Sequence, residues 1–135
     1  MKSLACFLVA VLCSTFAAAQ TCSDLHAVRA PIVEAFRTIN TAEVSYKFKN
    51  GRFVDLATLI ASPEMKRAVE QMNSSGNQAS FLRSDDPIPG YVVRLILAAD
   101  GKSYSLTATK KDGPCSHYGG TTDDRGVIYF IEPMR

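Results

Sequence analysis

The sequence has no apolar run after residue 19 long enough to cross a membrane, which takes roughly 20 apolar residues. It has no strong excess of one charge either, since 15 basic residues stand against 13 acidic ones. It contains no glycine-rich phosphate loop and no interleaving of basic and aromatic residues, which argues against a nucleotide site and a nucleic-acid surface. Only two histidines occur, His26 and His117, and neither stands in a known catalytic order with a serine or cysteine. We therefore expect both histidines to be ordinary surface or loop residues, and we expect no cofactor.

Residues 1–19 have the three parts of an export signal. Lys2 supplies the positive start, residues 4–16 form an uncharged apolar run, and residues 17–19 are small alanines. This order predicts cleavage after Ala19 and a secreted or periplasmic protein that keeps no membrane segment. The alternative is an uncleaved membrane anchor.

Cleavage leaves residues 20–135, a length typical of one domain. The loss of Lys2 lowers the formal net charge from +2 to +1. A net charge this small does not produce an electrostatic field that attracts nucleic acid or anionic lipid. We expect a single domain whose partner is another protein.

Two of the four cysteines, Cys6 and Cys13, lie in the export signal and leave with it. The remaining pair, Cys22 and Cys115, is predicted to form a disulfide, because paired cysteines are typical of exported domains. The alternative is a free or metal-binding thiol. His117 lies near Cys115, but two further ligands at usable spacing are missing.

The first half of the domain is predicted to be helical. Apolar residues recur at spacings of three and four from residue 31 to residue 49, which predicts a helix with Pro31 in its first turn. A short helix is expected at about 55–60, and another from Ser62 and Pro63 to about residue 71. Residues 73–89 are predicted to form a long loop.

The last third changes to the pattern of strands. Residues 91–97, 102–109 and 127–131 are predicted strands, and the first two are joined by a turn that ends in Asp100 and Gly101. A helix and a sheet can hide their apolar sides only against each other. The predicted class is therefore α+β, with one amino-terminal helix packed on an antiparallel sheet of three or four strands.

In the order of these segments the chain resembles the globular part of type IV pilin-like proteins and type II secretion pseudopilins. The resemblance is carried by residues 37–46 on the helix, 51–59 after it, 90–91 at the start of the sheet, 100–104 at the hairpin and 124–128 before the last strand. It implies a pilin-like fold. Family members that assemble keep a long hydrophobic amino-terminal helix, and here an ordinary export signal stands in its place. From this departure we expect a relative of the pilin domain that does not polymerise.

Acidic residues give one candidate metal site. Some pseudopilins hold calcium in a loop near their last strands, so Asp123 and Asp124 are calcium candidates, with Thr121 or Thr122 as further ligands. Calcium takes six to eight oxygens, and this acidic run is short. We favour the interpretation that Asp124 and Gly126 shape a turn.

Glu43 is the one charged residue beside the apolar stripe of the long helix. Such a residue commonly reaches the helix edge or pairs with a nearby lysine or arginine. The alternative is a buried carboxylate with a function or a partner. No second carboxylate is placed beside it by spacing, so acid–base catalysis is not predicted.

Several aromatic residues fall in or beside the predicted strands, and core packing is their commoner role: Tyr91, Tyr104, Tyr118, Tyr129 and Phe130. We expect a non-enzymatic domain that binds another protein through a sheet edge or the 73–89 loop, in a secretion or surface system. Two other classes stay open. One is a small secreted enzyme or enzyme inhibitor on an unrelated α+β fold. The other is an anchored pilin-like filament subunit, which requires residues 4–19 to stay attached.

Overall fold

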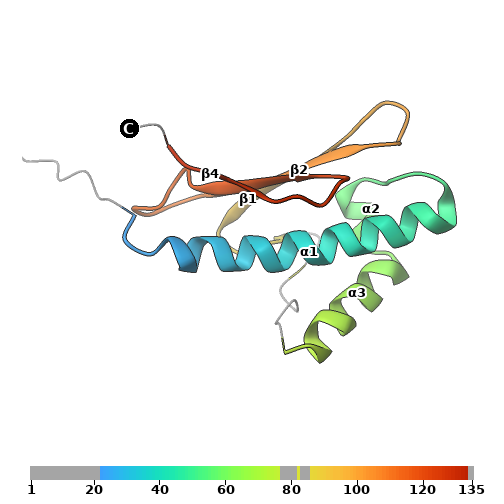
Figure 1. Cartoon of the computed structure of the whole chain (residues 1–135), viewed down its shortest axis with the longest axis horizontal. Helices are drawn as coiled ribbons and strands as arrows, with labels where there is room; N and C mark the ends of the chain where they lie inside the picture. The colour runs from blue at the N-terminus through green and yellow to red at the C-terminus, as the bar shows by residue number, and fades with distance from the viewer. Residues whose placement is uncertain (1–21, 77–81, 83–85, 134–135) are drawn as a thin grey trace, which may run out of the picture.

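The computed structural model describes residues 22–76, 82 and 86–133. The elements follow the order α1 (Leu25–Asn50), α2 (Leu56–Ile60), α3 (Pro63–Ser74), β1 (Tyr91–Leu97), β2 (Tyr104–Lys110), β3 (Gly119–Asp123) and β4 (Tyr129–Ile131). The predicted α+β class is confirmed, since the long helix packs on a four-stranded antiparallel sheet (Figure 1). The predicted export signal and much of the predicted 73–89 loop lie outside the described residues.

Helix α1 starts earlier than the sequence pattern predicts. The carboxylate of Asp24 accepts a hydrogen bond from Ala27 N–H at 2.9 Å, which caps the helix and lets it begin at Leu25. Pro31 therefore lies inside the helix rather than in its first turn. At an interior position a proline removes one backbone hydrogen bond. The predicted end is close to the observed one. Gly51, with φ of 78°, donates its N–H to the Lys47 carbonyl, and a left-handed residue of this kind closes a helix.

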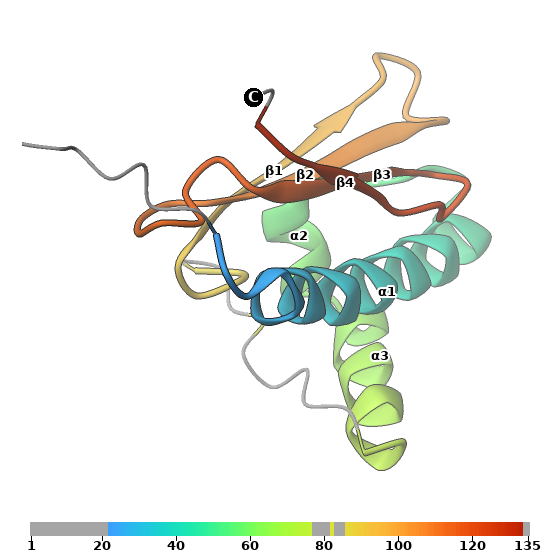
Figure 2. The same cartoon turned by 60° about the vertical axis from the view of Figure 1, so that its left-hand side comes forward.

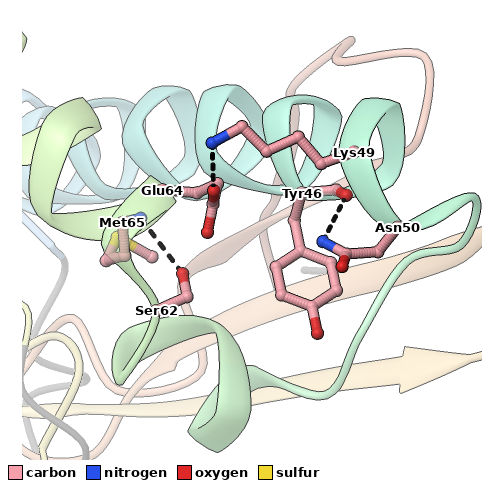
Figure 3. Close-up of polar contacts among 6 residues, drawn as sticks. All are labelled: Tyr46, Lys49, Asn50, Ser62, Glu64 and Met65. Carbon is pink, nitrogen blue, oxygen red and sulfur yellow. Dashed lines mark hydrogen bonds and ion pairs between the residues drawn. The ribbon is translucent and has the colours of Figure 1, made fainter.

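The second and third helices also begin at capping residues, of which Ser62 was predicted. Asp55 accepts a hydrogen bond from Thr58 N–H and starts α2. Ser62 accepts one from Met65 N–H at 3.2 Å and starts α3 with Pro63 in its first position (Figure 3). α3 continues three residues beyond the predicted end at residue 71.

The sheet is a meander in which sequential strands are neighbours, in the order β1-β2-β3-β4. β1 matches its predicted bounds, and Tyr91 pairs with Lys110 of β2 in the antiparallel register. β3 is the strand that the sequence did not specify, because its segment, GGTTD, contains no large apolar residue. The last strand is shorter than predicted: Val127 and Ile128 precede β4 rather than belonging to it.

The core lies between α1 and the sheet. Ile32, Phe36 and Ile39 on the stripe of α1 are fully buried, together with Leu106 of β2. Burial of one such side chain contributes about 2 kcal/mol. The predicted helix stripe is therefore confirmed as the main contribution of α1 to the core.

Gly120 of β3 lets α1 approach the sheet closely. A Cβ atom at this position would lie 2.8 Å from Cγ2 of Ile32 and 3.4 Å from Phe36. The branched Ile32 side chain has little freedom to move away. The absence of a side chain at Gly120 thus sets the distance between the helix and the middle of the sheet.

The predicted disulfide between Cys22 and Cys115 is confirmed. It joins the segment just before α1 to the loop between β2 and β3, across a sequence separation of 93 residues. Closing a loop of this size contributes about 4 to 5 kcal/mol in the chain-entropy account. The bridge therefore links the start of α1 to the end of the sheet at which β2 connects to β3.

The close approach at Gly120 yields a stability prediction. Gly120→Val should lower the free energy of unfolding by about 1 to 3 kcal/mol, because the added carbons collide with Ile32 and Phe36 in a filled core. Chemical denaturation of the purified domain measures this. Thr121→Val, one residue along β3 and on the other face of the sheet, is the matched control and should change stability by less than about 0.5 kcal/mol. Equal effects of the two substitutions would contradict the packing described here.

Candidate functional site

One face of the sheet is open. The three helices lie on the same side of the sheet, and no described element covers the opposite side (Figure 2). The burial of β2 alternates accordingly: Tyr104, Leu106 and Ala108 are buried under the helices, whereas Ser105 is exposed. We call the uncovered side the open face. It is available for contact with another molecule.

β1 forms one edge of this sheet. Just beyond its end, Ala98 N–H donates to the Ser103 carbonyl at 3.0 Å. Bonded pairs alternate in an antiparallel ladder, so the peptide groups of the even-numbered residues of β1 face β2. Those of Val93 and Leu95 point away from the sheet. In the part of the chain that the structure describes, no hydrogen bond from another segment reaches them.

The side chains of β1 on the open face are apolar except for one. Val92 is 42% exposed and Ile96 is 63% exposed, with exposed Arg94 between them. Natural proteins protect a long apolar edge strand with charged residues, prolines or β-bulges, because an unprotected edge strand pairs with other chains. On β1 the only protective residue of this kind is Arg94.

The other edge of the sheet is better protected. β4 spans only Tyr129–Ile131. The guanidinium of Arg29, on α1, lies 4.5 Å from the centre of the Phe130 ring and also pairs with the carboxylate of Glu132. These contacts hold β4 against the start of α1, which leaves β1 as the longer and freer edge.

A cleft of about 360 Å³ opens between α1 and α3. Its lining includes Val44 and Phe48 of α1, which are 56% and 91% exposed, and the buried Ala68 of α3. No described segment fills this cleft. It is a second apolar surface, separate from the sheet edge.

An ion pair fixes the wall of the cleft. Lys49 Nζ lies 2.6 Å from Glu64 Oε1 (Figure 3). Lys49 belongs to the last turn of α1 and Glu64 to the first turn of α3, so each charge also complements the dipole of its own helix. The hydrogen bond from Lys49 lowers the pKa of Glu64. The pair therefore holds the two helix ends together.

Glu43 is fully buried, contrary to the expectation that it would reach the helix edge or pair with a cation. Its Oε2 accepts a hydrogen bond from Val54 N–H at 3.3 Å, and its Oε1 has no partner among the described residues. Burial raises the pKa of Glu43 to about 7, opposed by the bond from Val54 and increased by the charge of Asp55. Of the alternative, a buried carboxylate with a function or a partner, the structure shows the burial.

Polar groups beside this carboxylate link α1 to two strands. Tyr104 Oη donates to Asn40 Oδ1 at 2.6 Å, and Asn40 Nδ2 donates to Thr122 Oγ1 at 3.3 Å. Burial raises the pKa of Tyr104, and the negative charge of Glu43 raises it further. These bonds fix how α1 is placed on β2 and β3. Sequence spacing gave no signal for them, because the partners are more than sixty residues apart.

The residues singled out from the sequence do not converge on one centre. His26, on the first turn of α1, and His117, in the loop before β3, are both exposed. Asp123 Oδ1 accepts a hydrogen bond from Arg125 N–H at 3.0 Å, as expected of a turn at these residues. Calcium binding by Asp123 and Asp124 stays a prediction. Among the described residues, no group of three or more His, Cys, Asp or Glu side chains is placed to hold a metal ion.

The aromatic residues divide between the core and the surface. Tyr91 and Tyr104 are buried, as core packing predicts. Tyr129 is 61% exposed on the open face, so its role is not core packing. Phe130 is 38% exposed and lies under Arg29.

Comparisons with known proteins identify no relative: no family model, curated protein or solved structure matches the chain. Within the described residues, no helix has the length and apolar character needed to span a membrane.

The buried carboxylate predicts how stability depends on pH. The pKa of Glu43 is raised from 4.5 to about 7 on folding, so the folded state binds the proton more tightly. The resulting stability is fully present below about pH 4.5 and is lost as the pH rises through 7. The free energy of unfolding should fall by about 3 kcal/mol across this window.

Glu43→Gln should remove most of this fall, because the amide has nearly the same shape and does not ionise. Denaturation midpoints at pH 5 and pH 8 measure the effect. The matched control is Glu34→Gln, which changes a half-buried glutamate on the same helix and should leave the fall intact. An unchanged fall in Glu43→Gln would show that Glu43 is not its source.

Proposed function

We propose that this chain is an exported, non-enzymatic domain that binds another protein by accepting an extended segment along β1. The observation that carries the proposal is the free edge: the peptide groups of Val93 and Leu95 point outward from a strand of seven residues. Each such residue offers one donor and one acceptor. An added strand can therefore form about four backbone hydrogen bonds with these two residues alone.

The side chains of β1 support the same mode of binding. Recognition by strand addition takes affinity from backbone bonds and specificity from alternate side chains. Val92 and Ile96 lie on the open face where the side chains of an added strand would cover them. Complete burial of one such side chain contributes about 1.5 to 3 kcal/mol.

The disulfide supports export as the setting of this function. Bridges such as Cys22–Cys115 form and persist in the periplasm and outside the cell, and are rare in the cytosol. An export signal on residues 1–19 is consistent with that compartment. The resemblance to pilin-like and pseudopilin domains favours a partner in a secretion or surface system.

Strand addition can be tested by blocking the outward N–H of Val93. Val93→Pro removes a donor that β2 does not use, and proline is tolerated on edge strands at such positions. A photo-crosslinking phenylalanine analogue in place of Ile96, in the source organism, should give a covalent adduct with another protein. Val93→Pro should lower the adduct yield by about tenfold or more, since it removes a backbone bond and obstructs the added strand.

Two controls separate binding from folding. Val93→Thr keeps the N–H and the branched shape, so the adduct should persist. The same crosslinker in place of Glu70, an exposed residue of α3, should not give it. Circular dichroism must show that Val93→Pro remains folded, and an adduct that survives in this folded variant would rule out strand addition.

A further inference from the structure

Arg94 carries a charge that the domain does not compensate. It is the only charged residue of β1, and it lies on the open face between Val92 and Ile96. In the described part of the chain, the ion pairs join other residues, and no hydrogen bond involves the Arg94 side chain. A guanidinium in this position has its full donor capacity available to an incoming carboxylate.

The residues across the sheet from Arg94 do not neutralise it. The ladder places Thr107 of β2 opposite Arg94, then Thr121 of β3, then Tyr129 of β4. Neither β1 nor β2 contains an acidic residue, and the second cation of this pair of strands is Lys110. Lys110 lies over the Tyr91 ring on the inner side of the sheet, so Arg94 is the only charged side chain that β1 and β2 place on the open face.

A second copy of the same edge fits poorly. Two antiparallel β1 strands with their full lengths overlapping would place Arg94 directly opposite Arg94 of the other copy. Like charges opposite each other in adjacent strands are destabilising. The single charge of β1 therefore acts against self-pairing and leaves the edge for a different sequence.

We infer that the segment added to β1 is acidic, with a glutamate or aspartate opposite Arg94 and apolar side chains opposite Val92 and Ile96. The inference rests on the strand addition proposed above and names the chemistry of the partner. Directly opposed side chains in neighbouring strands share one face of the sheet. The carboxylate thus meets the guanidinium on the open face, and the two apolar residues cover the apolar residues beside it.

Two capped seven-residue peptides test this pattern. Both have threonine at the odd positions and valine at positions two and six, and they differ only in glutamate or lysine at position four. Fluorescence anisotropy of labelled peptides measures affinity for the disulfide-bonded domain, and the amide chemical shifts of Val93 and Leu95 report whether binding is at the edge. At low salt the glutamate peptide should bind about tenfold more tightly, and the difference should shrink as salt is added.

A pair of charge-reversal variants assigns the preference to one residue. Arg94→Glu should reverse the order of the two peptides. Lys102→Glu makes the same change in net charge at the exposed tip of the β1–β2 hairpin and should leave the order unchanged. Reversal by both variants would show that only the overall charge matters, and would overturn the role of Arg94.

The remaining outcomes separate this inference from the proposed function. Equal affinity of the two peptides, with shifts at Val93 and Leu95, would overturn the acidic partner and leave strand addition standing. If neither peptide changes the amide chemical shifts of Val93 and Leu95, both the acidic partner and strand addition are overturned. A dimer of the free domain in sedimentation, abolished by Val93→Pro, would make a second copy the occupant and would also overturn the inference.

Discussion

The packing of α1 against the middle of the sheet is the constraint on which the rest of the structure depends. Gly120 admits Ile32 and Phe36 close to β3, and the disulfide from Cys22 fixes where the helix begins. The inner side of the sheet is covered most completely at β2, where Tyr104, Leu106 and Ala108 are buried, whereas three of the four inner side chains of β1 are half-buried. The peptide groups of Val93 and Leu95 are unbonded because β1 lies at the edge of the sheet and no other described segment bonds to them.

Much of this fold could be predicted from the sequence, because its local signals are strong. The helix stripe, the cap at Ser62, the β1–β2 hairpin and the disulfide each follow from residue type and spacing. The pattern predicts that the long helix starts at Pro31, a typical first-turn residue, whereas the cap at Asp24 starts it at Leu25. β3 was not specified because the glycine that makes its packing possible also weakens its strand pattern.

The candidate site was less predictable, because it depends on which strand ends at an edge. The sequence indicated a sheet edge or the 73–89 loop as the binding surface, but strand order and the outward direction of Val93 and Leu95 come from the ladder. Arg94 gave no signal by itself, since one arginine in an apolar strand is unremarkable until its neighbours across the sheet are known. The position of Glu43 beside the apolar stripe is visible in the sequence, but its hydrogen bond from Val54 N–H is not, because a helix pattern contains no contact with the segment after the helix.

The most direct test of the account is amide hydrogen exchange in the free, disulfide-bonded domain. Exchange at amides bonded within a ladder requires local or global opening, whereas unbonded edge amides exchange without it. If β1 is a free edge, the amides of Val93 and Leu95 should exchange about a hundredfold faster than those of their neighbours Val92, Arg94 and Ile96. Equally slow exchange at all five positions would show that the β1 edge is already covered, and would contradict both the free edge and the function proposed for it.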